Sequence, residues 1–370
     1  MTPTHGLLCG GQRRSLGRGS PGAVPPQPPQ HRDQAVAVTP TPVPPRLSAV
    51  PRSPLRCLCT PRRPHGSDTP GRSPSPAMAG PPGLKPLVAV GQVTSTPDKE
   101  LNFTACAGLV REAAGRGAAI VFLPEGFDYI GRDAAQTLSL AEGLDGDLMG
   151  RYADLARDCG VWLSLGGFHE RGRDWPTTQR IYNCHALLDP AGRLVAAYRK
   201  THLCDVELEG RVTMKESGFT NPGTEILAPV STPAGKLGLS ICYDLRFPEI
   251  SLALRRAGAE ILTYPSAFTV PTGSAHWEVL LRARAIESQC YVVAAAQSGK
   301  NHESRTSYGH SLVVDPWGAV VAQCREGPGL CYAEIDLDYL HRVRREIPVQ
   351  DHRRPDLYGT VAAAGLAPAP

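Results

Sequence analysis

The chain has 370 residues and a formal net charge of +4, with 41% hydrophobic and 20% charged residues. The charge is uneven, because residues 1–79 contain ten Arg, no Lys and two Asp, about +8, which leaves about −4 for the rest. That remainder has no Lys/Arg stripe, and no apolar run approaches the roughly 18 residues of a membrane span. We therefore expect no nucleic acid and no membrane among its partners.

Residues 1–79 are rich in Pro, Ser, Gly and Arg and lack periodic apolar runs, which predicts a disordered N-terminal extension. Many Arg and few acids are typical of a mitochondrial transit peptide. An extension without targeting function fits equally well, and synthesis from Met78 is a third alternative. We expect a soluble protein located in mitochondria and cytoplasm. The 11 cysteines lack a framework or metal-ligand spacing, which favours free thiols and no metal.

The folded domain is predicted at residues 84–347, followed by a C-terminal tail at 348–370. It opens with a buried-type strand, because residues 86–93 form an apolar run rich in β-branched side chains. Short apolar runs predict further strands, and apolar residues spaced three and four apart predict helices. We expect strands at 119–123, 161–165, 237–241, 261–264 and 291–296, and helices at 99–116, 134–158, 248–257 and 274–289.

Two other segments have the pattern of strand pairs joined by a turn that begins with Asp-Pro. The first pair is expected at 182–188 and 194–198, and the second at 311–314 and 319–323. Antiparallel pairs are thus combined with strand–helix units, which predicts an α/β fold with mixed sheets. No Gly-rich phosphate loop follows a strand, so the sequence gives no reason to expect a nucleotide.

Three chemically useful side chains each follow a predicted strand, where α/β folds place reactive groups. Glu125 follows the strand at 119–123, Lys200 follows the second hairpin strand, and Cys242 follows the strand at 237–241. An ammonium near a thiol favours the thiolate, and a carboxylate can remove the thiol proton. The same ammonium can stabilise a tetrahedral oxyanion. The three residues could therefore act together as nucleophile, general base and cationic stabiliser.

Taken singly, each of the three has a simpler explanation. A cysteine at a strand end is more often a small buried hydrophobe than a nucleophile. Glu125 could be a carboxylate that favours a helix N-terminus, and Lys200 could be a solvated surface charge. The case for catalysis therefore depends on the three residues occurring together in a specific sequence context.

That context consists of three motifs in a fixed order. Leu-Pro-Glu at 123–125, Tyr-Arg-Lys-Thr-His-Leu at 198–203 and Ile-Cys-Tyr-Asp-Leu-Arg-Phe-Pro-Glu at 241–249 resemble the signatures of the nitrilase superfamily of carbon-nitrogen hydrolases. The segments 264–278 and 282–290 resemble its Nit branch. The resemblance covers about residues 86–347 and implies an αββα sandwich of mixed sheets that needs no metal or organic cofactor.

The resemblance also implies the roles of site residues. Glu125, Lys200 and Cys242 match the catalytic positions of the superfamily. A second glutamate is common after the lysine, and Glu216 matches its place in the Nit branch. The rivals for this position are Glu207 and Glu209.

For substrate binding, Arg246 suits a carboxylate because a guanidinium can bind it in bidentate fashion. A structural ion pair of Arg246 with Asp244 or Glu249 is an equal alternative. His276 and Trp277 lie at the start of the helix expected at 274–289, and packing rather than catalysis is their expected role. The further substrate-binding candidates are Tyr243, whose N–H would help Lys200 to hold the oxyanion, Phe268, Thr272 and His276.

The function implied by the resemblance is a thiol-dependent amidase that hydrolyses a small-molecule amide. The expected substrate is a glutathione derivative whose amino group has become a keto group, and the expected role is metabolite repair. The alternatives are an omega-amidase or another hydrolase of keto-acid amides or nitriles, carbamoyl cleavage, acyl transfer, and a non-catalytic interaction protein on the same fold. A homo-oligomer, most simply a two-fold dimer, is expected as well.

Overall fold

The computed structural model of the protein describes residues 85–208 and 212–361. The predicted N-terminal extension at 1–79, with its targeting role, lies outside the described residues and stays a prediction. The last nine residues of the predicted C-terminal tail, 362–370, likewise lie outside the described range. Within the described ranges, no helix has both the length and the apolar character that a membrane crossing requires.

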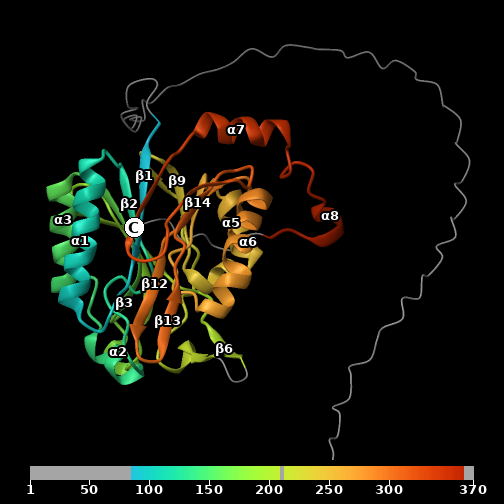
Figure 1. Ribbon diagram of the computed structural model, residues 1–370. Helices are drawn as coiled ribbons and strands as arrows, with labels where there is room; N and C mark the ends of the chain where they lie inside the picture. Colours follow the sequence, from blue (N-terminus) through green and yellow to red (C-terminus); the bar gives the residue numbers. More distant parts are fainter. Residues whose placement is uncertain (1–84, 209–211, 362–370) are drawn as a thin grey trace, which may run out of the picture. The chain divides into compact units, whose positions relative to one another are not determined.

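The described domain is an αββα sandwich, in which two mixed sheets lie face to face between two layers of helices (Figure 1). This arrangement confirms the predicted fold class. The first sheet has the order β13-β12-β1-β2-β3-β4-β5, and β16 also pairs with β1. Its strands are β1 (Leu87–Val93), β2 (Ile120–Leu123), β3 (Trp162–Glu170), β4 (Tyr182–Leu188), β5 (Leu194–Arg199), β12 (Ala296–His302), β13 (Arg305–Tyr308) and β16 (Gly329–Glu334).

The second sheet has the order β15-β14-β11-β10-β9-β8, and a separate two-stranded hairpin is formed by β6 and β7. The strands of the second sheet are β8 (Val230–Thr232), β9 (Gly235–Leu239), β10 (Ile261–Thr263), β11 (Tyr291–Ala294), β14 (Leu312–Val314) and β15 (Val320–Gln323). The hairpin consists of β6 (Asp205–Leu208) and β7 (Val212–Lys215).

Helices α1 and α3 cover the first sheet, and α5 and α6 cover the second (Figure 1). The larger helices are α1 (Lys99–Gly115), α3 (Asp147–Cys159), α5 (Pro248–Arg256), α6 (Val270–Ser288) and α7 (Leu337–Glu346). The shorter ones are α2 (Ala134–Leu140), α4 (Trp175–Thr178), α8 (Pro355–Tyr358) and the 3-10 turns η1 (Glu216–Gly218) and η2 (Cys242–Arg246).

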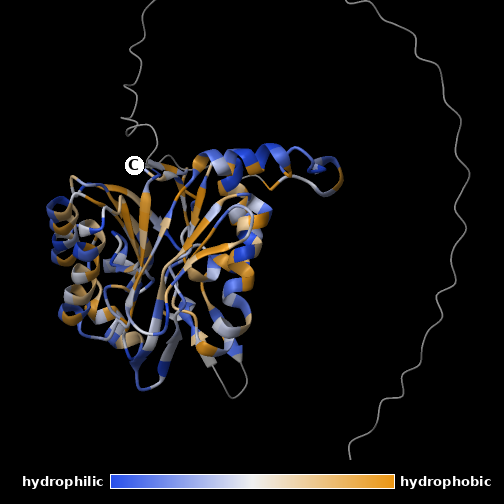
Figure 2. Cartoon of the chain, turned by 45° about the horizontal axis from the view of Figure 1, so that its top comes forward, coloured by the Kyte–Doolittle hydropathy of each residue, from blue (hydrophilic) through white to orange (hydrophobic). Residues whose placement is uncertain are grey.

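The core has two layers, and β1 shows how the sequence creates them. Val88 and Val90 point into the space between the sheets, whereas Ala89 and Val93 point toward α1. Alternate residues of a strand face opposite sides, so a strand buried on both faces must be apolar throughout. Each buried Val or Leu contributes about 1.5–3 kcal/mol to stability. Figure 2 accordingly shows hydrophobic residues concentrated along the strands between the helical layers.

Two predicted helices differ from those observed. The helix expected at 134–158 is wrong as a single element, because α2 ends at Leu140 and α3 begins at Asp147. Between them, the backbone of Glu142 pairs with β3, where its N–H donates to His169 and its carbonyl accepts from Arg171. The helix expected at 274–289 starts earlier, at Val270, because a proline in the first helical turn needs no hydrogen-bond partner.

Candidate active site

The three strand-end residues converge at one end of the space between the sheets. Glu125 lies two residues beyond β2, Lys200 directly follows β5, and Cys242 begins η2 just after β9. All three line the same cavity, which has a volume of about 850 Å³. The strand-end argument therefore placed them together correctly, although they are far apart in the sequence.

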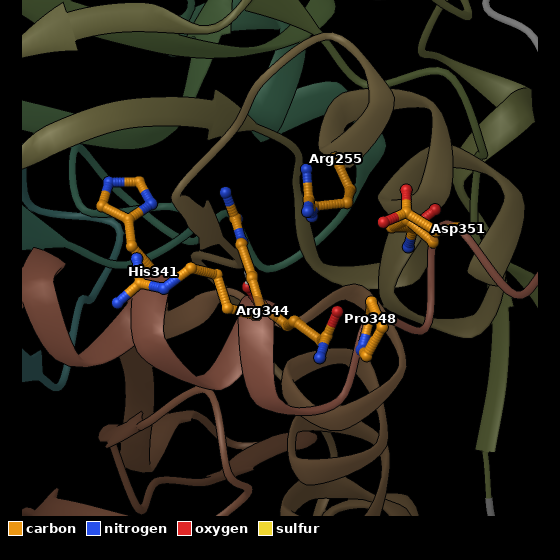
Figure 3. A pocket seen from close by; sticks show the side chains of 8 residues that line it. Arg255, His341, Arg344, Pro348 and Asp351 are labelled. Carbon is orange, nitrogen blue, oxygen red and sulfur yellow. Dashed lines mark hydrogen bonds between the residues drawn. The ribbon is translucent and has the colours of Figure 1, made fainter.

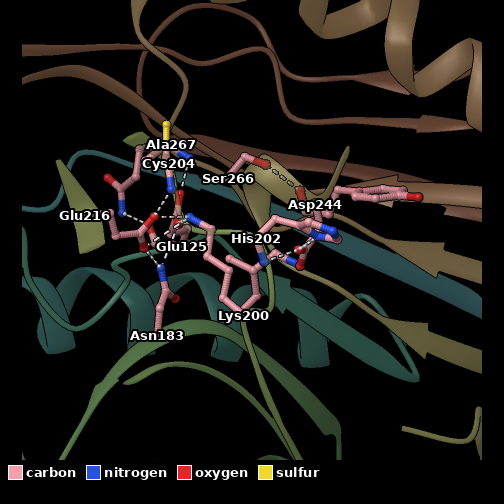
Figure 4. A network of polar contacts seen from close by, with 12 residues as sticks. Glu125, Asn183, Lys200, His202, Cys204, Glu216, Asp244, Ser266 and Ala267 are labelled. Carbon is pink, nitrogen blue, oxygen red and sulfur yellow. Dashed lines mark hydrogen bonds and ion pairs between the residues drawn. The ribbon is translucent and has the colours of Figure 1, made fainter. Parts of the chain in front are cut away.

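Lys200 is the centre of the cluster (Figure 4). Its Nζ lies 2.9 Å from Glu125 Oε1 and 2.9 Å from Glu216 Oε2, and its side chain is only 2% exposed. A buried ion pair is stable only when its remaining polar atoms are also satisfied. Here the backbone N–H of Ala267 donates to the other oxygen of Glu125, and the backbone N–H of Cys204 donates to Glu216.

Asn183, on β4, links the two carboxylates. Its Nδ2 donates to Glu125 Oε1 at 2.9 Å and to Glu216 Oε1 at 3.1 Å. Sequence reasoning missed this residue, although a polar side chain within an otherwise apolar strand is a usable signal. The structure thus brings Glu216 into the cluster, and Glu207 does not line the cavity. Glu207 is exposed on β6, and Glu209 lies outside the described residues.

The ionisation states of the ion pair follow from its surroundings. Burial alone would raise the pKa of Glu125, but the charge of Lys200 and hydrogen bonds from Cys242, Lys200 and Asn183 outweigh it and leave the pKa lowered. Burial alone would lower the pKa of Lys200, but the charges of Glu125 and Glu216 outweigh it and raise the pKa well above its usual value. At neutral pH, the site therefore holds a carboxylate base beside a permanent ammonium.

Cys242 has a strained backbone and a protonated thiol. Its φ is 45°, in the left-handed region that non-glycine residues avoid, at a cost of about 1–3 kcal/mol. Burial, followed by the charge of Glu125, raises the pKa of the thiol well above its usual value despite the lowering effect of Lys200. The lowering effect of the ammonium is thus outweighed by burial and by the Glu125 charge, so the resting thiol keeps a proton that a general base can remove.

Asp244 joins two parts of the site: the turn that contains Cys242 and the segment that contains Lys200. It is fully buried, and its Oδ2 accepts from Tyr198 Oη at 2.8 Å and from the Ile241 N–H at 2.9 Å. Its Oδ1 accepts from the His202 N–H at 3.1 Å. From the sequence, Asp244 was considered only as an ion-pair partner of Arg246, and that pairing is wrong because these contacts occupy its carboxylate.

Arg246 instead faces the cavity. Within 85–208 and 212–361 it forms no ion pair, either with Asp244 or with Glu249, and its Nη1 lies 3.3 Å from His276 Nδ1. Its guanidinium also lies over the rings of Tyr243 and Phe268. All the predicted substrate-binding residues line this cavity, namely Tyr243, Arg246, Phe268, Thr272 and His276.

The turn η2 contains a backbone N–H, that of Tyr243, that has no backbone acceptor within the described part of the chain. The N–H of Cys242 donates to the Pro265 carbonyl, and the hydrogen bonds of the turn start at the Asp244 N–H. The Tyr243 N–H lies between these two donors, in a residue that lines the cavity. Lys200 and Cys242 line the same cavity.

A second hollow of about 300 Å³ lies beside α7 (Figure 3). Its lining is cationic, with Arg255, Arg344 and His341 among its residues, and it contains no cysteine, serine or threonine. Without a nucleophile it does not offer the chemistry of the larger cavity. Nor do the described segments hold any group of three or more His, Cys, Asp or Glu side chains suited to a metal ion.

The fold is an αββα sandwich, and it brings a cysteine, a lysine and two glutamates to one cavity. This combination defines the class of protein, a hydrolase with a cysteine in its candidate active site. The sequence model of the carbon-nitrogen hydrolase family matches residues 87–345. The chain belongs to this family, and it is therefore a hydrolase of carbon-nitrogen bonds other than peptide bonds.

Similar proteins include both curated and solved members of the family. A human protein named deaminated glutathione amidase is 69% identical over 276 residues, which cover 75% of this chain and 84% of that protein. The crystal structure of the C. elegans NitFhit protein matches with a TM-score of 0.71 at 51% identity, covering 75% of this chain and 66% of that one. A mutant amidase from Nesterenkonia sp., with an acetamide moiety covalently added at the active site cysteine, matches with a TM-score of 0.62 at 26% identity, covering 75% and 97% of the two chains.

Proposed function

We propose that this protein is a thiol-dependent amidase that hydrolyses deaminated glutathione, a reaction of metabolite repair. The name of the human relative, at 69% identity, supports the substrate. The observation that carries the chemistry is the position of Lys200 between Glu125 and Glu216, beside Cys242. This arrangement supplies a base, a cation and a nucleophile around one acyl carbon.

In the first half of the reaction, the Sγ of Cys242 attacks the amide carbonyl while Glu125 takes the thiol proton. Attack and proton transfer occur together, because the raised pKa of the thiol disfavours a free thiolate. Lys200 and the Tyr243 N–H stabilise the oxyanion. Glu125 then gives its proton to the amide nitrogen, the C–N bond breaks, and the amine leaves a thioester on Cys242.

In the second half, Glu125 takes a proton from water as the water oxygen bonds to the acyl carbon. The C–S bond then breaks, the proton returns to Sγ, and the carboxylic acid is released. Glu216 keeps Lys200 charged and in place throughout, since its two carboxylate oxygens lie 3.2 and 2.9 Å from the ammonium. Glu216 is in this account a positioning residue.

The cavity suits an acyl group that carries a carboxylate. Arg246 lies on the turn of the nucleophile, has no carboxylate partner among the residues described, and is backed by the ring of Phe268. A guanidinium in this position binds a carboxylate in bidentate fashion. The hydroxyls of Thr269 and Thr272, which are 2.9 Å apart, offer further donors on the same wall.

The test is product analysis with purified protein. Deaminated glutathione should yield a keto diacid and a dipeptide amine, and Cys242→Ser should abolish this turnover. Cys159→Ser is the matched control, because Cys159 is a partly buried thiol at the end of α3 and outside the cavity. Turnover of nitriles alone would overturn the amidase assignment, and unchanged turnover by Cys242→Ser would overturn the nucleophile.

We also propose a homo-oligomer, most simply a dimer. Exposed apolar side chains support it, with Val279 and Ile286 on α6 and Leu357 and Tyr358 on α8. Sedimentation should show twice the monomer mass, and a monomer at micromolar concentration would contradict the proposal. A location in mitochondria and cytoplasm rests on the composition of residues 1–79 alone, and mass spectrometry of the natural N-terminus tests it.

A further inference from the structure

The active-site cavity has a second cationic wall, separate from Arg246. Arg305 opens β13, His302 ends β12, and Arg132 precedes α2, and all three line the cavity. Burial, followed by the charges of Arg305 and Arg132, lowers the pKa of His302, which shows that the three groups are close together. The two arginines thus place positive charge on this wall, beside His302, without a role in the reaction described above.

Arg305 lines this wall, and the hydrogen bonds of its guanidinium are incomplete. Its Nη2 donates to the Ala267 carbonyl at 3.1 Å, but its Nε is shielded from solvent and has no partner in the part of the chain that the structure describes. A charged donor left without a partner is costly, and a carboxylate is the group that fits a guanidinium best.

The acidic side chains of the same loops are already engaged. Asp133 lines the cavity, but its Oδ1 accepts from the Gln136 N–H at the start of α2. Glu303 pairs with Lys300 at 3.0 Å and is almost fully exposed. Across 85–208 and 212–361, neither Arg132 nor Arg305 forms an ion pair. The charge on this wall is therefore available to a ligand.

The contacts of Arg305 also indicate which half of the substrate it would meet. Ala267 accepts from Arg305 through its carbonyl and donates to Glu125 through its N–H. Glu125 is the group that protonates the departing amine, so the amine half must leave on the Glu125 side. Arg246, by contrast, lies on the turn that carries the nucleophile and faces Phe268.

We propose that Arg305, with Arg132 and His302 beside it, forms a binding site for a carboxylate on the amine half of the substrate. The enzyme then selects amides whose leaving amine bears a free carboxylate, as the C-terminal end of a peptide does. This inference rests on the proposed amidase function and deepens it. Arg305 acts as a specificity-determining residue, and Arg132 at the rim contributes less because it is exposed.

The test uses two substrates that differ by one charge: deaminated glutathione and the same compound with its terminal carboxylate converted to a carboxamide. The readout is the ratio of their kcat/KM values. Wild-type protein should prefer the carboxylate about 10- to 100-fold, as expected for one hydrogen-bonded ion pair. Arg305→Gln should bring the ratio close to 1, mainly through KM, and Arg305→Lys should restore part of the preference.

The matched control is Arg111→Gln, which removes an exposed Arg on α1, outside the cavity. It should keep the wild-type ratio. The inference is wrong if wild-type protein hydrolyses both substrates with a ratio near 1, or if Arg305→Gln keeps the preference. Hydrolysis of neither substrate by wild-type protein overturns the proposed function instead. Because the ratio is measured within one protein, partial misfolding of a variant lowers both rates and leaves the readout intact.

Discussion

Replacing Lys200 by Met would leave two carboxylates in a buried site without the ammonium that joins them. The stem of the side chain is kept, so the change isolates the charge. Removal of one partner from a buried ion pair costs about 3–5 kcal/mol, because the other charge stays buried without compensation. The loss should fall on stability and on activity alike, since Lys200 both neutralises Glu125 and faces the oxyanion.

The stability loss should depend on pH in a direction that the pKa shifts define. In the wild type, the lowered pKa of Glu125 contributes stability above the unfolded value of about 4.3, which is lost as the pH falls through the folded pKa. In Lys200→Met, the hydrogen bonds from Cys242 and Asn183 remain but the charge that opposes burial is gone, so the folded pKa should lie above the unfolded value. The variant therefore loses stability as the pH rises, by about 1.4 kcal/mol for each unit of that shift.

Urea unfolding at pH 5 and pH 8 measures this difference. The gap in unfolding free energy between wild type and Lys200→Met should be wider at pH 8 than at pH 5. Lys236→Met is the control, because Lys236 is exposed on β9, and it should change stability by less than about 0.5 kcal/mol. A gap below about 1 kcal/mol for Lys200→Met, or one that is equal at both pH values, would refute the reasoning.

Two further variants test the nucleophile and its base. Glu125→Gln should abolish turnover yet speed the alkylation of Cys242 by iodoacetamide at pH 8, because the Glu125 charge and hydrogen bond raise the pKa of the thiol. Peptide mass spectrometry measures the alkylation rate, and slower alkylation than in the wild type would contradict the account. In urea unfolding, Cys242→Gly should be more stable than Cys242→Ala by about 1 kcal/mol, because glycine adopts the φ of 45° at this position without strain. The opposite order of stabilities would show that the turn is not strained.

The sequence predicted the mixed sheets and the main site because both depend on local patterns, whereas the sandwich itself was implied by the family resemblance of the three motifs. Continuous apolar runs such as that of β1 mark strands buried on both faces, and polar residues directly after such strands mark a shared edge of the fold. Glu125, Lys200 and Cys242 were found in this way. The motifs around them, rather than their residue types, made the combination specific.

Other parts of the site depend on contacts that no local pattern encodes. Asn183 sits in the middle of the cluster, but nothing in its neighbourhood in the sequence connects it with Glu216, 33 residues away. The pairing of β16 with β1 and the close approach of Arg305 to Ala267 likewise require the finished fold. The raised pKa of Cys242 could not be predicted either, because it results from opposing effects of burial and two charges whose balance is set by geometry.

The central claim is that the acyl group of the substrate becomes attached to the sulfur of Cys242. Intact-protein and peptide mass spectrometry after rapid acid quenching of a reaction with excess deaminated glutathione tests it directly. The account predicts one added acyl group, on the peptide that contains Cys242, and none in Cys242→Ser. An adduct on Cys204 or another residue, or turnover by wild-type protein without any adduct under conditions that preserve thioesters, would contradict it.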